Sequence, residues 1–246
     1  MLRNNIINKS ESYTCIFKSA GGKKLFYKVI KNAAKFILSL FFTVKITGRE
    51  NIVDDGPFII SSNHLSNYDP ILISLMFQNH IHFLAKAELC NHRLTSWFFK
   101  KLRVIPVNRQ SGIVIRPVRE TLKLLQEGKV IGIFPEGTRV ANGKEIEPKK
   151  GVAFFAVKSN VPVLPVAITF HKSKFRVRQK ALINIGSPID LSSRKTVDYK
   201  ELASDILQQS RKLALKNNEN EIILKNGQRS KLNNIFEIIP SLLKKS

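Results

Sequence analysis

Short apolar runs alternate along this sequence with stretches of helical periodicity, and this alternation constrains the fold more than any other feature. Runs of about four to eight apolar residues between polar or glycine residues predict buried strands, whereas longer amphipathic stretches predict helices. Strands that alternate with helices build a sheet with helices on its faces. We therefore expect an α/β fold with a mixed, mostly parallel sheet flanked by helices.

The expected strands cover residues 57–60, 81–85, 103–107, 130–134 and 161–168, and the expected helices cover residues 70–77, 117–127, 150–158 and 198–215. Pro162 and Pro165 lack backbone donors, so the strand that holds them is expected at an edge of the sheet or interrupted. One or two further strands are expected within residues 175–185. Basic residues recur there at alternate positions, either on a solvated face or in a second basic patch.

The N-terminal part consists of a polar lead, residues 1–22, and an amphipathic segment from Lys24 to Val44. Four lysines fall within an arc of about 60° on a helical projection, opposite a mainly apolar side: Lys24, Lys28, Lys31 and Lys35. This pattern is typical of a helix in a membrane interface, although a surface helix packed on the core has a similar stripe. The charge-free apolar part is too short to span a bilayer. We expect residues 1–45 to form a lead and a membrane-interface helix, and residues 46–246 to form the main domain with a C-terminal helical extension.

The charge of the chain indicates a polyanionic partner. It has 41 Lys+Arg against 18 Asp+Glu, a formal charge of +23, which fits an anionic membrane or nucleic acid. Zinc-finger spacing and the aromatic signature of RNA-recognition motifs are both missing, which argues against nucleic acid. Cys15 and Cys90 form no C-x-x-C, so neither disulfides nor a zinc ribbon is expected, and a reduced cytosolic setting is the simplest inference.

The most informative polar stretch follows the run at 57–60 and places His64 five residues before Asp69. Because Pro70 comes next, Asp69 is expected at the N-cap of a helix. On one helix the two side chains would lie about 140° apart, whereas a loop that ends at Asp69 lets them meet. The carboxylate would then hold one imidazole nitrogen and leave the other as a base. The alternative is that Asp69 only caps the helix and His64 is a polar loop residue.

Two further polar groups follow predicted strands. Arg109 follows the run at 103–107, and the run at 130–134 leads into Pro135-Glu136-Gly137-Thr138-Arg139. In open α/β sheets, binding and chemistry gather beyond the carboxyl ends of the strands. His64, Arg109 and Glu136 are therefore expected at strand ends in one region.

Two other patterns predict no site. The stretch from Gly132 to Arg139 imitates a P-loop but lacks the lysine followed by Ser or Thr that binds phosphate and magnesium. His80, His82, Cys90 and His92 match no standard zinc spacing, so no metal is expected.

Two blocks together, Asn63-His64 with Asp69 and Phe134-Pro135-Glu136-Gly137-Thr138-Arg139, resemble the H-x4-D and F-P-E-G-T-R motifs of the glycerolipid acyltransferase family. This family includes the 1-acylglycerol-3-phosphate acyltransferases. The blocks occur in the family's order and at a family-like separation, and the resemblance covers about residues 46–190. Arg103 and Asn108 depart from the glycine and aspartate that family members often carry, which leaves the identity of the acceptor open.

The resemblance implies an enzyme that transfers a fatty acyl chain from acyl-CoA or acyl-ACP to the free hydroxyl of lysophosphatidate or another lysolipid. With lysophosphatidate the product is phosphatidate, in phospholipid biosynthesis. His64 is expected to act as general base and Asp69 to orient it, with direct transfer and no acyl-enzyme. The expected substrate-binding residues are Lys86, Arg109, Glu136, Gly137, Thr138 and Arg139. Surface solvation is the alternative for Lys86 and Arg109.

The same resemblance implies no cofactor, because the thioester is a co-substrate. The expected partners are an anionic membrane surface, the lysolipid acceptor, and acyl-CoA or acyl carrier protein, and not nucleic acid. The expected location is the cytoplasmic face of a membrane. Two alternatives from other classes stay open: a basic nucleic-acid-binding protein and a membrane-bound scaffold without catalysis.

Overall fold

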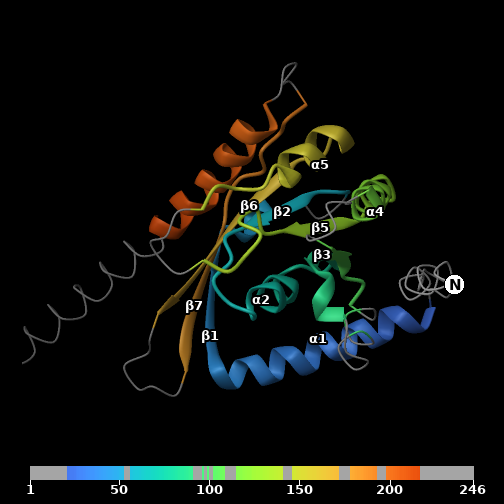
Figure 1. Ribbon diagram of the computed structural model, residues 1–246. Coiled ribbons are helices and arrows are strands. Elements are labelled where there is room, and N and C mark those ends of the chain that lie inside the picture. Colours follow the sequence, from blue (N-terminus) through green and yellow to red (C-terminus); the bar gives the residue numbers. More distant parts are fainter. Residues whose placement is uncertain are drawn as a thin grey trace, which may run out of the picture.

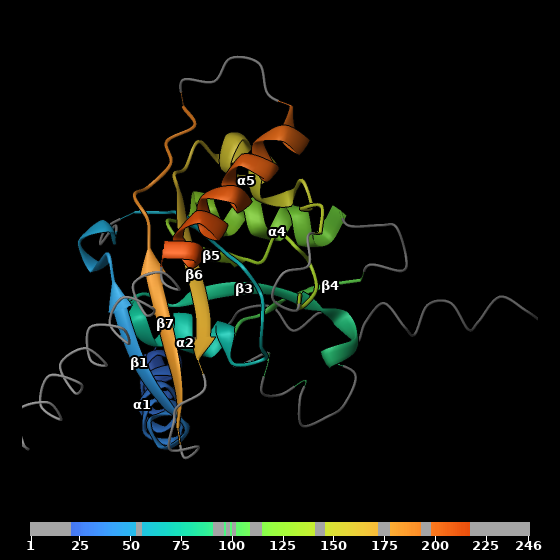
Figure 2. The ribbon, with the colours of Figure 1, turned by 90° about the vertical axis from the view of Figure 1, so that its left-hand side faces the viewer.

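The computed structural model describes residues 21–52, 56–90, 96, 99, 102–108, 115–140, 146–171, 178–192 and 198–216. Within these residues, seven strands form one sheet with helices on both of its faces (Figure 1 and Figure 2). The predicted α/β fold with a mixed, mostly parallel sheet is confirmed.

In chain order, the first elements are α1 (Gly21–Phe41), β1 (Phe42–Thr47), the 3-10 helix η2 (Arg49–Asn51), β2 (Ile59–Ser62), α2 (Asp69–Met76), β3 (Ile81–Lys86), the 3-10 helix η3 (Ala87–Cys90) and β4 (Ile105–Val107). They are followed by α4 (Ile115–Gln126), β5 (Val130–Ile133), α5 (Gly151–Ser159), β6 (Val163–His171), β7 (Gln179–Ile185) and a helix over residues 199–216. The helix expected to reach Val44 ends at Phe41. The chain then turns into β1, which is rich in the β-branched residues that suit a strand and which pairs with β7.

The strand order is β1-β7-β6-β2-β5-β3-β4. The strands from β6 to β4 are parallel to one another, whereas β7 pairs antiparallel with β6, and β1 runs parallel to β7. The segments that follow β2, β5, β3 and β4 therefore all begin at the same edge of the sheet. We call this edge, where residues 63, 134, 87 and 108 leave their strands, the carboxyl edge.

Apolar side chains on both faces of the central strands build two cores. Ile59 and Ile131 belong to the core under α4, α5 and the helix at 199–216, whereas Ile60 and Val130 belong to the core under α1 and α2 (Figure 1). Parallel strands covered on both faces are apolar at successive positions. This explains why the sequence shows continuous apolar runs here rather than an alternation with polar residues.

The strand that contains Pro165 lies inside the sheet, between β7 and β2, so the expected edge position is wrong. The Pro165 carbonyl accepts a hydrogen bond from Gly186 N at 2.8 Å, on the β7 side. Because N–H and C=O of one strand residue point to the same side, the donor that proline lacks also faces β7. The ladder between β6 and β7 begins one residue later, at Val166. Proline therefore removes a bond only at the end of that ladder, and pairing with β2 is untouched.

Helix α1 packs on the body through the side that carries Lys31. The Lys31 ammonium donates to the Phe77 carbonyl, and Leu38 is buried with Phe42 of β1. The opposite, apolar side is 48% to 66% exposed at Val29, Phe36, Ile37, Leu40 and Phe41. The apolar stripe is thus not the side that packs on the core. Among the described residues, no helix combines the length and apolarity needed to cross a bilayer.

Two histidines fix the turn that leads into β4. The His80 Nε2–H donates to the Leu102 carbonyl at 2.9 Å, and the His82 Nδ1–H donates to the Arg103 carbonyl at 3.1 Å. The His82 side chain is buried, and its Nε2 has no hydrogen-bond partner among the described residues. Burial lowers the pKa of each imidazole to about 4, and the positive charge of Arg103 acts in the same direction. Both side chains are therefore neutral at physiological pH.

This arrangement predicts acid-sensitive stability. The unfolded chain binds protons at these histidines below about pH 6.5, whereas the folded chain binds them only near pH 4, so stability is lost as pH falls between the two values. We expect His82 to contribute about 2 kcal/mol to the loss of unfolding free energy between about pH 7.5 and pH 5. Urea unfolding at both pH values measures it, and His82→Gln should flatten the pH dependence by that amount. An identical pH dependence in wild type and variant would contradict the assignment.

Candidate active site

The loop after β2 begins with a side chain that continues the sheet. Asn63 is buried, its Nδ2 donates to the Ile168 carbonyl at 2.9 Å, and its Oδ1 accepts from Ile168 N at 2.8 Å. The amide thus extends the pairing of β2 with β6 beyond the last register pair, Ser62 with Val166. Because both atoms of the amide are held, the next residue, His64, leaves the sheet at a fixed point of the carboxyl edge.

His64 and Asp69 meet as predicted. The His64 Nδ1 lies 2.9 Å from Asp69 Oδ2, and the same oxygen accepts from Leu65 N at 2.7 Å and Ser66 N at 2.8 Å. The aspartate side chain is fully buried, and the histidine side chain is 18% exposed. An oxygen that accepts from two amides is an acceptor for the imidazole as well, so Nδ1 carries the hydrogen. Nε2 is then left with a lone pair that can take a proton.

The capping role expected for Asp69 is wrong in detail. Helix α2 begins at Asp69 itself, and the N-cap residue is Tyr68, which makes no side-chain cap bond. The Asp69 carboxylate turns back to the loop and accepts from residues 64–66. The hydrogen bonds of the aspartate therefore order the loop and the imidazole, and Pro70 starts the helix without a side-chain cap.

The loop after β5 forms a tight turn next to this pair. Gly137 N donates to the Phe134 carbonyl at 2.9 Å, with Pro135 at the second position of the turn and a left-handed φ of 67° at Gly137. Val140 N donates to the His64 carbonyl at 2.8 Å. The backbones of the two loops are therefore joined directly at the histidine.

Glu136 supplies a second link between the loops. Its Oε2 accepts from His64 N at 2.9 Å, and its Oε1 lies 3.9 Å from Arg211 Nη2, in the helix at 199–216. The side chain is only 5% exposed. Burial raises the pKa of Glu136, while the His64 amide and the Arg211 charge oppose this rise. The carboxylate therefore holds the histidine backbone and does not face solvent.

A column of aromatic rings supports the imidazole from one side. The Phe134 ring stacks on His64 with centroids 4.2 Å apart, and Phe83 stacks behind Phe134 at 5.8 Å. The Phe83 ring occupies the space above Gly132, where a Cβ atom would lie 2.3 Å from it. Sequence reasoning missed this column. The sequence signal for the column is Gly132 in the middle of β5, because a glycine inside a strand often marks a place where other atoms approach the backbone closely.

Of the remaining predicted site residues, some lie at the carboxyl edge and others fall outside the described residues. Lys86 ends β3, and Thr138 and Arg139 follow the turn after β5, so all three lie at the carboxyl edge with exposed side chains. Arg109 lies outside the described residues, as does His92. In the described part of the chain, no three His, Cys, Asp or Glu side chains lie close enough to hold a metal ion.

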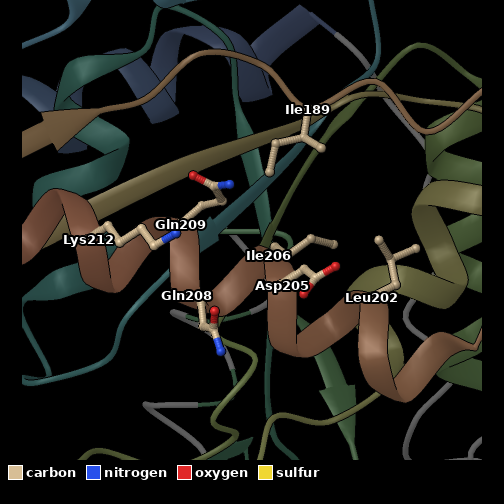
Figure 3. Close-up of a pocket in the computed structure, with 7 residues that line it drawn as sticks. All are labelled: Ile189, Leu202, Asp205, Ile206, Gln208, Gln209 and Lys212. Atoms are coloured by element: carbon tan, nitrogen blue, oxygen red, sulfur yellow. The ribbon is translucent and has the colours of Figure 1, made fainter.

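A separate hollow lies along the helix at 199–216. It has a volume of about 160 Å³, and Figure 3 shows the side chains that line it: Ile189, Leu202, Asp205, Ile206, Gln208, Gln209 and Lys212. None of the predicted site residues is among them. The candidate active site is therefore the histidine and its supports at the carboxyl edge, and not this hollow.

Comparison with known proteins finds acyltransferases that are similar to this chain. The sequence model of the family described as Acyltransferase matches residues 43–169. A 1-acyl-sn-glycerol-3-phosphate acyltransferase of Bacillus subtilis is 34% identical over 167 residues, which cover 66% of this chain and 82% of that protein. One of Borreliella burgdorferi is 31% identical over 162 residues, which cover 64% of this chain and 63% of that protein.

A solved structure is similar as well. The crystal structure of the 1-acyl-sn-glycerophosphate (LPA) acyltransferase from Thermotoga maritima superposes with a TM-score of 0.65 at 30% sequence identity. The match covers 81% of each chain. The likeness thus extends well beyond the residues of the two short motifs.

The aromatic column predicts a specific packing defect. Gly132→Ala places a Cβ atom 2.3 Å from the Phe83 ring, so this ring must shift, and we expect the shift to disturb the stacking of Phe134 on His64. We expect a loss of about 1–3 kcal/mol in the free energy of unfolding, as is usual for overpacking. Urea unfolding measures it. Gly151→Ala is the matched control, because the added Cβ there meets nothing closer than 3.8 Å, and an equal loss in both variants would refute the steric account.

Proposed function

This chain belongs to the acyltransferase family, and on that premise we propose that it transfers a fatty acyl chain from an acyl thioester to the free hydroxyl of lysophosphatidate. The product would be phosphatidate, in phospholipid biosynthesis. The family resemblance predicted from the two motifs is confirmed. One observation carries the proposal: His64 is held by Asp69 through Nδ1, which leaves Nε2 as a base at the carboxyl edge.

In the proposed reaction, the base acts directly on the acceptor. The Nε2 atom of His64 takes the proton of the acceptor hydroxyl while its oxygen attacks the thioester carbonyl carbon. The imidazolium that forms lies beside the buried Asp69 carboxylate, whose negative charge stabilises it. The carbon–sulfur bond then breaks, and the proton on Nε2 passes to the departing thiolate. No acyl-enzyme forms, so a nucleophilic serine or cysteine is not required.

The acceptor's phosphate needs a cationic pocket. Lys86 and Arg139 are exposed at the carboxyl edge, and we assign phosphate binding to them together with Arg109. Gly137 and Thr138 would border the glycerol, since they follow the turn beside His64. Glu136 would act on the acceptor indirectly, through its hydrogen bond to the His64 backbone. Either acyl-CoA or acyl carrier protein can bring the thioester in this scheme.

One departure from the family pattern has a backbone explanation. Arg103, where relatives often carry glycine, has a left-handed φ of 51° in the turn that His82 holds. Glycine adopts this conformation without strain, whereas other residues adopt it at a cost of about 1–2 kcal/mol. Arg103 thus occupies a position whose backbone conformation also suits glycine, so this departure by itself does not argue against lysophosphatidate as acceptor.

The proposal predicts a defined loss of activity. Purified protein with lysophosphatidate and a fatty acyl thioester should form the diacyl product. His64→Ala should lower kcat by about 10²–10⁴-fold, the usual contribution of a general base. Asn67→Ala, an exposed change in the same loop, should keep wild-type kcat. Product chromatography with several lysolipids and both donors identifies the substrates. Equal turnover by wild type and His64→Ala would rule out the mechanism.

The exposed side of α1 suggests where the enzyme meets its lipids. Val29, Phe36, Ile37, Leu40 and Phe41 present an apolar stripe to solvent, while Lys31 packs inward. A helix whose apolar side is largely exposed within the described part of the chain, in a protein of formal charge +23, suits an anionic membrane surface. We propose that this stripe inserts into the membrane interface and brings the carboxyl edge to lipid substrates.

Vesicle binding tests this attachment. The double variant Phe36→Ser with Leu40→Ser removes two of the apolar side chains that are expected to insert into the membrane. Because each inserted side chain contributes roughly 1.5–3 kcal/mol, the affinity for anionic vesicles, measured by sedimentation, should fall tenfold or more. Asn32→Ser changes an exposed polar residue of the same helix and should bind as wild type does. Binding that is equal in all three proteins, or a salt-sensitive shift of labelled DNA without vesicle binding, would exclude the membrane proposal.

A further inference from the structure

The helix at 199–216 reaches both loops of the candidate active site, although it lies outside residues 43–169 that match the family model. We propose that Arg211 of this helix is a positioning residue, which holds Glu136 and through it the backbone of His64. The inference rests on the proposed function for its kinetic consequence. Its structural part depends only on contacts between described residues.

The contact runs through two side chains to the backbone of His64. Arg211 Nη2 lies 3.9 Å from Glu136 Oε1, and the other oxygen of Glu136 accepts from His64 N at 2.9 Å. The same guanidinium nitrogen donates to the Ile146 carbonyl at 3.4 Å. Arg211 is 30% exposed on its side chain, so solvent screens this ion pair only in part. The guanidinium therefore joins the helix to the turn after β5 and to the segment that returns from it.

The neighbouring residue attaches the helix to the strand before the histidine. Ser210 is fully buried, and its hydroxyl donates to the Ser61 carbonyl at 3.1 Å, within β2. A further ion pair joins Lys200 and Glu147 at 2.7 Å, but both side chains are more than half exposed, so it contributes little. Ser210 thus fixes the helix against β2, and this sets the distance from which Arg211 reaches Glu136.

The charge of Arg211 has a definite effect on Glu136. The charged groups that act on this carboxyl are Arg211 and, when protonated, His64, which favour its ionised form, and Asp69, which opposes it together with burial. An ionised carboxylate is a stronger acceptor for the His64 amide than a neutral carboxyl. Removing Arg211 raises the pKa of Glu136 further, so the amide would lose its ionised partner at a higher pH than in wild type.

Three variants test the proposal: Arg211→Ala, Arg211→Lys and Lys212→Ala. Lys212 is the matched control, because it is an exposed cation next in sequence that lines the separate hollow (Figure 3). With lysophosphatidate and an acyl thioester, we expect Arg211→Ala to lower kcat about tenfold, with both KM values within about twofold of wild type. The acidic limb of the kcat profile should move to higher pH. Arg211→Lys should recover part of both changes, and Lys212→Ala should match wild type.

A second readout does not depend on turnover. The His64 amide resonance should titrate with Glu136, and its midpoint should move to higher pH in Arg211→Ala but not in Lys212→Ala. An unmoved midpoint, a change in KM alone, or equal effects in the two alanine variants would overturn the positioning role. If the wild type acylates no lysolipid but the midpoint still moves in Arg211→Ala, the proposed function is contradicted and the contact between Arg211 and Glu136 is supported. If Arg211→Ala does not fold, Arg211→Lys is judged by the same titration.

Discussion

Three donors converge on one buried oxygen, and the candidate site depends on that arrangement. Asp69 Oδ2 accepts from the His64 imidazole and from the amides of Leu65 and Ser66. The negative charge of this fully buried carboxylate therefore lies beside Nδ1, where it would stabilise a developing imidazolium.

The direction of the strands explains why distant loops share this edge. β2, β5, β3 and β4 are parallel neighbours, so the segments after them begin at one side of the sheet. The histidine is then held from four sides: by Asp69, by Val140 on its carbonyl, by Glu136 on its amide, and by the Phe134 ring. Each support comes from a short connection to a rigid strand or helix. The imidazole is therefore ordered before any substrate arrives.

Much of this could be predicted from the sequence, and the limits have physical causes. The apolar runs predict the central strands because both faces of a parallel sheet are buried, and the His64–Asp69 contact is predictable because it closes within one loop. The central position of β6 was missed because a proline fits inside a sheet when its missing N–H faces a neighbour that does not need it. The sequence shows that Pro165 is present but not which neighbouring strand it faces. The roles of Phe83 and Arg211 depend on contacts between segments far apart in the chain. Periodicity and spacing carry no signal for these.

Helix α1 shows why an amphipathic pattern alone does not say which side packs. Leu38 lies on the same side of α1 as Lys31, and the core buries it together with Phe42 of β1, so the larger apolar stripe remains outside. At roughly 1.5–3 kcal/mol per side chain, insertion of Phe36, Ile37 and Leu40 would outweigh the contribution of about 1 kcal/mol per lysine at an anionic surface. The apolar stripe would therefore supply most of the proposed membrane affinity. The basic residues would then select which lipid surface the enzyme binds.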